Sequence, residues 1–507
     1  MCLRPVLFII IFQMIFYSGI SQSLSRDQIS SLSQKQFPKA IETYREFLSI
    51  PNNGNFPEET AMNVAWCMKT FKRLGFQAQI IQSKGVPHVY AEKKSKKSDR
   101  SILFYLQIDG QPVDTSAWNQ ESPFKAVLKT LKDGKWETIG WERLESDYSP
   151  DYRVFARSAS DSKGPAIAFL SAIEIMKNEN IEADFTIKVI ADFQEEMGSR
   201  TLPELVLANK ELFDAEMMLI MDGTRHISNL PTLTFGARGI ATITLKVFGA
   251  TRNLHSGQYG NYAPNPVFKL AKLIGAMKDE EGRVTIPGFY EGVNLSERDL
   301  ELLNDVPEDQ EEIQRSLGIA GPDSVGSTYQ ESLQYPSLNV RGLRAAWTGK
   351  EVRTLIPAEA VAEIDMRLVP ETDGLRQVSL VRNFIEEQGF HMVDSIPSEE
   401  ERRQYSKLIS FNYRLGSKPF RTELSSPIGD WLSSAMERTF GDQFVKMRAT
   451  GGSQPIAPFI TTLNLPAVSV RIPNPDNNIH APNENLRVGN FLEGIQMCLG
   501  VLTQKLN

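Results

Sequence analysis

The sequence predicts a doubly wound α/β domain with a smaller α+β module inserted into it. Strand-like apolar runs alternate with helix-like stretches through residues 76–222, and the alternation returns from residue 427 onward. Between these regions, residues 241–248 and 358–368 alternate apolar and polar side chains, as strands with one exposed face do. A chain of 507 residues with 41% hydrophobic side chains is long enough for two or three domains.

Residues 1–21 have the pattern of a secretory signal peptide. Arg4 precedes an apolar core at residues 6–17, and the small residues Gly19 and Ser21 are placed for cleavage after Ser21. The apolar run is too short for a comfortable membrane span, so a retained anchor is the weaker alternative. No later stretch of the sequence is suited to crossing a bilayer. The pattern predicts a secreted or periplasmic protein.

The main domain is predicted in two parts, residues 22–235 and 416–507. Periodicity gives the elements of the first part: helices at 37–50 and 58–74, and strands at 76–82, 86–91, 101–108, 185–193 and 216–221. Residues 111–150 form a long polar excursion, expected to lie over the rim of the sheet. The second part is predicted to contain a helix at 428–440, a strand at 467–472 and a helix at 488–506.

The inserted module is predicted to span residues 236–415 and to hold a small antiparallel, ferredoxin-like sheet. Its two alternating strands are each followed by a helix, at 267–277 and 375–388. The acidic segment 279–336, punctuated by Pro and Gly, is expected to be an insertion with little core of its own.

Composition narrows the possible partners. The net charge is −7, from 55 basic and 62 acidic residues, so nothing suggests a nucleic-acid partner. Once the leader is removed, two cysteines remain, Cys67 and Cys498. They could pair in an oxidising compartment, but both lie in apolar helical patterns and are more typical of small core residues.

Carboxylates follow several of the predicted strands directly. Because groups past the carboxyl ends of neighbouring strands gather on one rim of an α/β sheet, these acids are expected to lie close together. They are Asp109, Glu195, Glu196 and Asp222, with Asp161 just ahead of the helix-like stretch at 164–178. Like charges this close repel unless protons or cations intervene, which indicates a metal. The alternative is that each acid caps a helix or faces solvent.

His480 lies in a turn-rich loop ahead of the last helix, and a histidine in such a place can bind a metal. Together with the acids of the rim it makes a set rich in oxygen donors, which suits zinc, or manganese and cobalt where carboxylates dominate. The adjacent Glu195 and Glu196 suit two different tasks. One can bind the metal while the other takes a proton from an activated water.

The order of these motifs resembles the carnosinase and aminoacylase family of co-catalytic zinc peptidases, which includes acetylornithine deacetylase. The resemblance rests on QIDGQP (107–112), SASDSKGP (158–165), QEEMGS (194–199), Asp222, LHSGQYG (254–260) and NIHAPNE (478–484). It is greatest to the carnosinase-like dipeptidase branch, through FGARG (235–239), NLHSGQYGN (253–261) and EIDMRLVP (363–370). The fold implied is a doubly wound zinc-peptidase catalytic domain with an inserted lid and dimerisation domain.

The resemblance implies a role for each matching residue. Asp161 bridges two metal ions, one completed by Glu196 and His480, the other by Asp222 and position 107. Glu195 is the general base, and Asp109 orients the residue at position 107. Substrate contacts are implied for His255, which polarises the scissile carbonyl from a second subunit, for Thr354 and Arg367, which hold the C-terminal carboxylate, and for Gly452 and Ser453, in a turn that lines the site.

Two positions depart from the family pattern. Gln107 stands where the family has histidine, and its carbonyl oxygen is a weaker zinc donor than imidazole, so this metal position is weak, empty or filled by a harder ion. Thr450 stands where the carnosinase-like branch has an acid that recognises a free amino terminus, which makes N-acyl amino acids more plausible substrates.

The sequence therefore predicts a metal-dependent hydrolase, with one or two zinc ions, that cleaves the amide bond of small peptides or N-acyl amino acids. Mn²⁺ or Co²⁺ are alternative cofactors, and a homodimer formed through the inserted domain is expected. Two alternatives stay open. One is a single-metal deacylase that uses only Asp161, Glu196 and His480, and the other is a catalytically weak binding relative.

Overall fold

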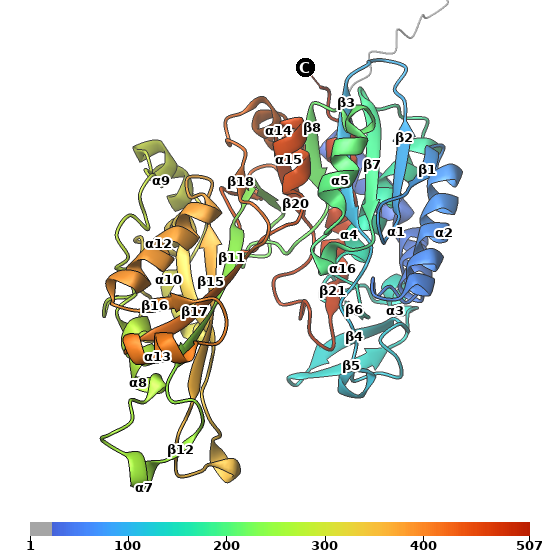
Figure 1. Cartoon of the computed structure of the whole chain (residues 1–507). Coiled ribbons are helices and arrows are strands. Elements are labelled where there is room, and N and C mark those ends of the chain that lie inside the picture. The colour runs from blue at the N-terminus through green and yellow to red at the C-terminus, as the bar shows by residue number, and fades with distance from the viewer. Residues whose placement is uncertain (1–22, 507) are drawn as a thin grey trace, which may run out of the picture.

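The computed structural model describes residues 23–506 and shows two bodies side by side (Figure 1). The predicted signal peptide at 1–21 lies outside these residues. Within the described range, none of the helices combines the length and the apolar character needed to span a membrane.

The larger body is built on a mixed eight-stranded sheet. Its four inner strands, β7, β3, β8 and β20, run parallel, while β1 and β2 on one side and β9 on the other introduce antiparallel pairs. In sheet order the strands are β1 (Gln77–Ile81), β2 (His88–Lys93), β7 (Thr186–Asp192), β3 (Ser101–Gln107), β8 (Met217–Ile220), β20 (Ala467–Arg471), β9 (Thr232–Thr234) and β19 (Val445–Met447). The inner strands are buried on both faces, as helix-covered parallel strands are.

Helices cover both faces of this sheet, as a doubly wound fold requires (Figure 1). The larger core lies under α1 (Arg26–Leu48), α2 (Pro57–Arg73), α4 (Lys163–Asn178), α14 (Pro427–Phe440) and α16 (Val488–Leu502). The smaller core lies under α5 (Leu202–Ala208), α6 (Lys210–Phe213) and α15 (Ala457–Leu463). The first helix begins at Arg26 rather than at residue 37, because Ser25 forms a capping box with Gln28.

The polar excursion at 111–150 is ordered into a second small sheet, which the sequence did not predict. This sheet has the order β21-β6-β4-β5, and its strands are β21 (Asn485–Arg487), β6 (Arg153–Phe155), β4 (Val127–Lys132) and β5 (Lys135–Ile139). The excursion also contains η1 (Thr115–Ala117) and α3 (Arg143–Ser146). Because β6 leads into the Asp161 loop and β21 follows the His480 loop, pairing of these strands brings two distant segments together.

The smaller body contains a five-stranded sheet formed entirely from residues 239–415. Its order is β13 (Ser337–Arg344), β15 (Glu359–Leu368), β11 (Gly239–Phe248), β17 (Leu408–Leu415) and β16 (His391–Val393). Alternate residues of β11 and β15 point into a core covered by α8 (Pro266–Gly275) and α12 (Gly374–Glu387). An α/β domain with an inserted α+β module is therefore confirmed as the fold class, with a mixed sheet in the main domain.

Short elements complete the smaller body. The pair β10 (Gly236–Ala237) and β18 (Phe420–Arg421) links it to the larger body. At its far end lie β12 (Leu254–His255), α7 (Ser256–Tyr259), η3 (Gly349–Glu351) and β14 (Leu355–Ile356), which we call the distal tip (Figure 1). The smaller body also contains α13 (Glu399–Gln404) and, in the acidic segment, α9 (Glu297–Asn304), α10 (Gln310–Leu317) and α11 (Tyr329–Ser332).

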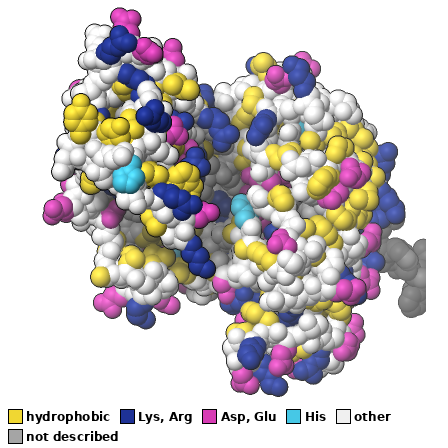
Figure 2. All heavy atoms as spheres, turned by 60° about the horizontal axis from the view of Figure 1, so that its bottom comes forward, with side chains coloured by type: hydrophobic (Ala, Val, Ile, Leu, Met, Phe, Trp, Pro, Cys, Tyr) yellow, Lys and Arg dark blue, Asp and Glu magenta, His cyan; other side chains and the backbone are white. Residues whose placement is uncertain are grey.

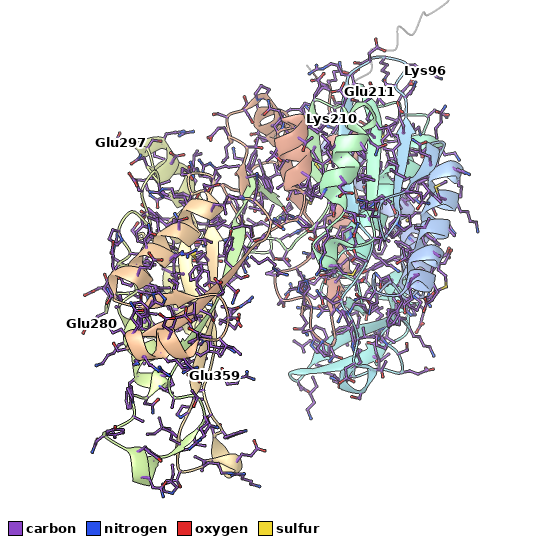
Figure 3. The ribbon with its side chains drawn as sticks, in the orientation of Figure 1. Lys96, Lys210, Glu211, Glu280, Glu297 and Glu359 are labelled. Atoms are coloured by element: carbon purple, nitrogen blue, oxygen red, sulfur yellow. The ribbon has the colours of Figure 1, made fainter. Side chains whose placement is uncertain are left out.

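The acidic segment at 279–336, which was expected to have little core of its own, contributes both to the core of the module and to contacts with the larger body. Its residues Ile286 and Phe289 join the module's core. Two of its carboxylates reach the larger body: Asp299 lies 3.0 Å from Arg448, and Glu308 lies 3.2 Å from His226. Other acidic side chains of the segment, such as Glu280 and Glu297, lie on the side away from the central sheet (Figure 3). The segment therefore braces the two bodies against each other.

Candidate metal centre and active site

Asp161, Glu196 and His480 come together at the rim of the central sheet. His480 Nε2 lies 3.0 Å from Asp161 Oδ2 and 3.3 Å from Glu196 Oε2, and one ligand atom from each residue lies within 4.8 Å of the others. The two carboxylates are nearly buried, with 7% and 6% of their side chains exposed, whereas the imidazole is half exposed. Two carboxylates and one imidazole at this spacing fit a divalent ion such as zinc, manganese or cobalt.

Electrostatics point the same way. Burial raises the pKa of Glu196 to about 10, and the nearby charges of Asp161 and Asp109 act in the same direction. A hydrogen bond to Asp161 raises the pKa of His480. These acids crowd each other in a site of low dielectric, and a cation is the partner that would let them stay ionised together.

Asp109 fixes the turn that carries the two glutamates. Its carboxylate accepts the backbone N–H of Glu195 at 3.0 Å and that of Glu196 at 3.1 Å. These bonds hold η2 (Glu195–Met197), the turn that follows β7, against the end of the neighbouring strand β3. The expected orienting contact with Gln107 is not among the hydrogen bonds of residues 23–506. Asp109 positions the glutamates instead.

Glu195 is placed to handle a proton beside the trio. Burial raises the pKa of its carboxyl well above the usual range, and the charges of Asp222, Asp161 and Glu196 add to the effect. A carboxyl group with a raised pKa next to a metal-binding trio suits a general base, because its proton affinity approaches that of the group it must deprotonate.

Glu484, which the sequence reading left out, ties the histidine loop to the Asp161 loop. Its fully buried carboxylate accepts the backbone N–H groups of Ser158, Ser160 and Asp161 at 2.8–2.9 Å. The guanidinium of Arg157 lies 2.7 Å from the same carboxylate. The only signal in the sequence was an acid four positions after the histidine in NIHAPNE.

Replacing Glu484 by glutamine is expected to lower the affinity for Zn²⁺ about 10- to 100-fold, as loss of a group that supports a metal ligand does. The amide of glutamine has an N–H donor of its own, and this donor would face the backbone N–H groups and the guanidinium that the carboxylate of Glu484 now accepts. Competition with a chelating dye measures the affinity. The control is Glu211→Gln, an exposed residue at the far end of the larger body (Figure 3). Equal affinity in the two variants would contradict the role of Glu484.

The residues of the second implied metal position, Gln107 and Asp222, lie in a different setting. Asp222 accepts a hydrogen bond from Ser162 Oγ at 2.6 Å on one oxygen and from Gln454 Nε2 at 3.3 Å on the other. Burial raises the pKa of Asp222, and the charge of Asp161 adds to this, whereas the charge of Arg471 lowers it. Gln107 is buried, and neither atom of its amide has a hydrogen-bond partner within residues 23–506.

The implied substrate contacts fall into two groups. Arg367, on β15, donates to Ser453 Oγ at 3.0 Å, so the inserted module contacts the turn that contains Gly452. His255 and Thr354 instead lie together on the distal tip, where the N–H of Ser256 donates to the carbonyl of Thr354 at 3.2 Å. The tip lies far from the central sheet of its own chain (Figure 1). Between its two bodies the molecule is hollowed (Figure 2).

The model of peptidase family M20/M25/M40 matches residues 103–504, most of the chain. The chain belongs to this family. Among relatives of this M20 peptidase, the Cys-Gly metallodipeptidase dug1 of Schizosaccharomyces pombe is 28% identical over 432 residues, 80% of this chain and 86% of the relative. The Beta-Ala-His dipeptidase of Homo sapiens is 25% identical over 494 residues, 93% of this chain and 90% of the relative.

Solved structures give the same picture. The M20 family metallo-carboxypeptidase Sso-CP2 from Sulfolobus solfataricus has a TM-score of 0.74 at 26% identity, covering 92% of this chain and 99% of its own. Human carnosine dipeptidase 1, at 23% identity, has the same fold with a TM-score of 0.73, covering 95% of this chain and 98% of its own. Metal-dependent hydrolysis of peptides is therefore the activity of this M20 peptidase.

The geometry explains how the chain would serve that reaction. Asp161, Glu196 and His480 would hold a divalent ion, which would supply polarisation of the scissile carbonyl and lower the pKa of a water molecule. Glu195 is the group placed to accept the proton of the attacking water and to return it to the leaving amine. Asp109 and Glu484 keep the two glutamates and Asp161 in place through their backbone N–H groups.

Proposed function

We propose that this M20 peptidase is an exported, zinc-dependent hydrolase of short peptides that have a free C-terminal carboxylate. The observation that carries the proposal is the trio of Asp161, Glu196 and His480 with the Glu195 carboxyl beside it. Two carboxylates and an imidazole suit Zn²⁺, and Mn²⁺ or Co²⁺ also accept this donor set. Two relatives that share most of the chain's length are named as dipeptidases, which supports a dipeptide as the substrate.

The substrate's carboxylate is assigned to Arg367 and Ser453. Their contact joins the inserted module to the turn after β19, so an anion bound there would lie between the two bodies. A guanidinium and a hydroxyl are suitable donors for a carboxylate. C-terminal amidation of a substrate should therefore abolish most of its turnover.

N-acyl amino acids are a second candidate substrate class, because Thr450 offers no negative charge for a free amino terminus. Its backbone is held in place, since its N–H donates to Gly236 and its carbonyl accepts from Arg238. An acidic side chain introduced at position 450 would therefore extend from a backbone that is held in place. A hydrogen bond to a charged group contributes about 1.5–3 kcal/mol.

We expect Thr450→Glu to raise kcat/KM for dipeptides with a free amino terminus about tenfold or more, and to leave N-acetylated forms unchanged or slower. The measurement is a panel containing Cys-Gly, β-Ala-His and their N-acetyl and C-amidated counterparts, with Zn²⁺, with Mn²⁺ and after chelation. Thr450→Gln is the uncharged control. Turnover that survives complete removal of metal, or absence of turnover on every member of the panel with metal present, would contradict the proposed function.

The distal tip supports a homodimer that shares its active sites. His255 and Thr354 are both exposed there, together with the apolar side chains of Tyr262, 86% exposed, and Val352, 64% exposed. The module's sheet also ends in the edge strand β13. Exposed apolar side chains and an open sheet edge both favour association. We therefore assign His255 and Thr354 to the active site of the partner subunit.

Export rests on the leader pattern at 1–21. N-terminal analysis of the mature protein from its native host should begin near Gln22. Protein that retains Met1 in a cytosolic fraction would contradict the assignment.

A further inference from the structure

Three residues on neighbouring strands share one level at the rim of the central sheet: Gln107, Asp222 and Arg471. The register pairs Tyr105 of β3 with Ile220 of β8, and Ile220 with Ser469 of β20. These three strands are parallel, so a step of two residues along each one leads to Gln107, Asp222 and Arg471. Side chains two residues apart in a strand face the same side of the sheet, so this row points the same way as the row below it.

Hydrogen bonds show that Ser469 of the lower row and Asp222 of the upper row face the same side. Ser469 Oγ donates to Gln454 Oε1 at 3.3 Å, and Gln454 Nε2 donates to Asp222 at 3.3 Å. The amide of Gln454 therefore links Ser469 of the lower row to Asp222 of the upper row. Ser162 completes the chain: its Oγ donates to Asp222 at 2.6 Å and lies 3.2 Å from Asp161 Oδ1.

The guanidinium of Arg471 is buried at the end of this row. The residue is only 5% exposed, and its Nε and Nη2 have no hydrogen-bond partner among residues 23–506. Its Nη1 occupies the space beside Gly223, where a Cβ would stand 1.3 Å from that nitrogen. Gly223 also has φ +87°, a conformation that favours glycine. The absence of a side chain at Gly223 therefore leaves room for a permanent cation there, close enough for its charge to act on the Asp222 carboxyl.

We propose that Arg471 supplies the positive charge beside Asp222 that a second metal ion would otherwise supply, so that each chain holds one divalent ion. An arginine side chain stays protonated in proteins, and its charge opposes a dication at the same place. The donors agree with this. Gln107 offers a neutral amide, and both oxygens of Asp222 already accept hydrogen bonds. The residues at this position therefore do not fit a second ion.

Arg471 acts here as a positioning residue. It places a positive charge beside Asp222, Asp222 holds the hydroxyl of Ser162, and Ser162 adjoins the metal ligand Asp161. The inference rests on the proposed function only in that the trio of Asp161, Glu196 and His480 must bind a metal.

The test is metal stoichiometry in the mature full-length protein. The metal-free protein is titrated with Co²⁺ and followed by visible absorption, and bound Zn²⁺ is measured after dialysis by elemental analysis. We expect one ion per chain in the wild type. The double variant Gln107→His/Arg471→Met should bind two ions per chain. In Gln107→His alone the second ion should bind on the order of 100-fold more weakly than in the double variant, because the guanidinium remains.

Two further variants keep the test decisive if the double variant folds poorly. Asp222→Asn should leave the end point at one ion, because Asp222 is not a metal ligand in this scheme, while the affinity for that ion falls about 10- to 100-fold because Asp222 supports Asp161 through Ser162. Arg471→Lys keeps the charge and should also stop at one ion. Arg438→Met removes a partly buried arginine whose guanidinium contacts the carbonyl of Gly500, and controls for general destabilisation, followed by thermal unfolding.

Each result decides the matter. One ion in the wild type and two in a folded double variant support the inference, as does one ion in Asp222→Asn. Two ions in the wild type overturn the inference while leaving the proposed function intact. Complete loss of the ion in a folded Asp222→Asn protein overturns it as well, because Asp222 would then be a ligand of that ion. No bound ion in the wild type contradicts both this inference and the proposed function.

Discussion

Replacing Glu195 by glutamine is expected to lower kcat by about 10²- to 10⁴-fold while the protein still binds its metal. Glutamine keeps the shape of the side chain and the backbone N–H that Asp109 accepts, but it cannot take up a proton. The loss therefore falls on proton transfer. Steady-state kinetics on a substrate that the wild type cleaves, paired with a Zn²⁺ determination, measures both quantities.

Glu196→Gln is the matched comparison, since the two residues are adjacent in the same turn. Glu196 is a member of the trio, 3.3 Å from His480, so this variant should lose metal affinity as well as activity. Glu211→Gln controls for the removal of one negative charge. Equal loss of metal in Glu195→Gln and Glu196→Gln would contradict the assignment of proton transfer to Glu195 and metal binding to Glu196.

Activity should return when inactive Glu195→Gln and inactive His255→Ala subunits exchange. The distal tip carries His255 away from its own central sheet (Figure 1), and under the proposed homodimer each active site takes its histidine from the tip of the second subunit. A heterodimer of the two variants has one complete site. Random pairing of equal amounts should restore about one quarter of wild-type activity.

Native mass spectrometry verifies that subunits have exchanged, and a mixture of Glu195→Gln with Glu196→Gln is the control. These two residues lie in one turn, so no pairing of those chains can restore a complete site. Thr354→Ala should complement Glu195→Gln in the same way as His255→Ala, because the two residues share the tip. If exchange is verified and activity stays at the level of the control mixture, His255 does not act across the interface.

The sequence by itself determined the fold class and the placement of the acids. Apolar runs that end in Asp109, Glu195 and Asp222 indicated parallel strands, and the carboxyl ends of such strands must meet at one rim. The rule works because it depends only on strand direction. The order of the motifs along the chain indicated the peptidase family, and the family model that matches residues 103–504 confirms it.

Prediction from local sequence patterns was wrong for segments whose structure depends on pairing with a distant part of the chain. The hairpin β4–β5 was read as an irregular excursion because its strands are polar and are stabilised by pairing with β6, and β6 in turn pairs with β21. The start of α1 was missed because a capping box decides it, while the hydrophobic periodicity becomes clear only later in the helix.

Tertiary structure alone decided what each site residue contacts. Glu484 accepts a hydrogen bond from the backbone N–H of Asp161, 323 positions away in the sequence. Asp109 accepts one from the backbone N–H of Glu196, 87 positions away. The level shared by Arg471 and Asp222 follows from strand register, which no local pattern contains. The sequence could name the groups that bind a metal or move a proton, because chemistry resides in residue types. Which charge lies beside which depends on contacts made when distant segments pack together.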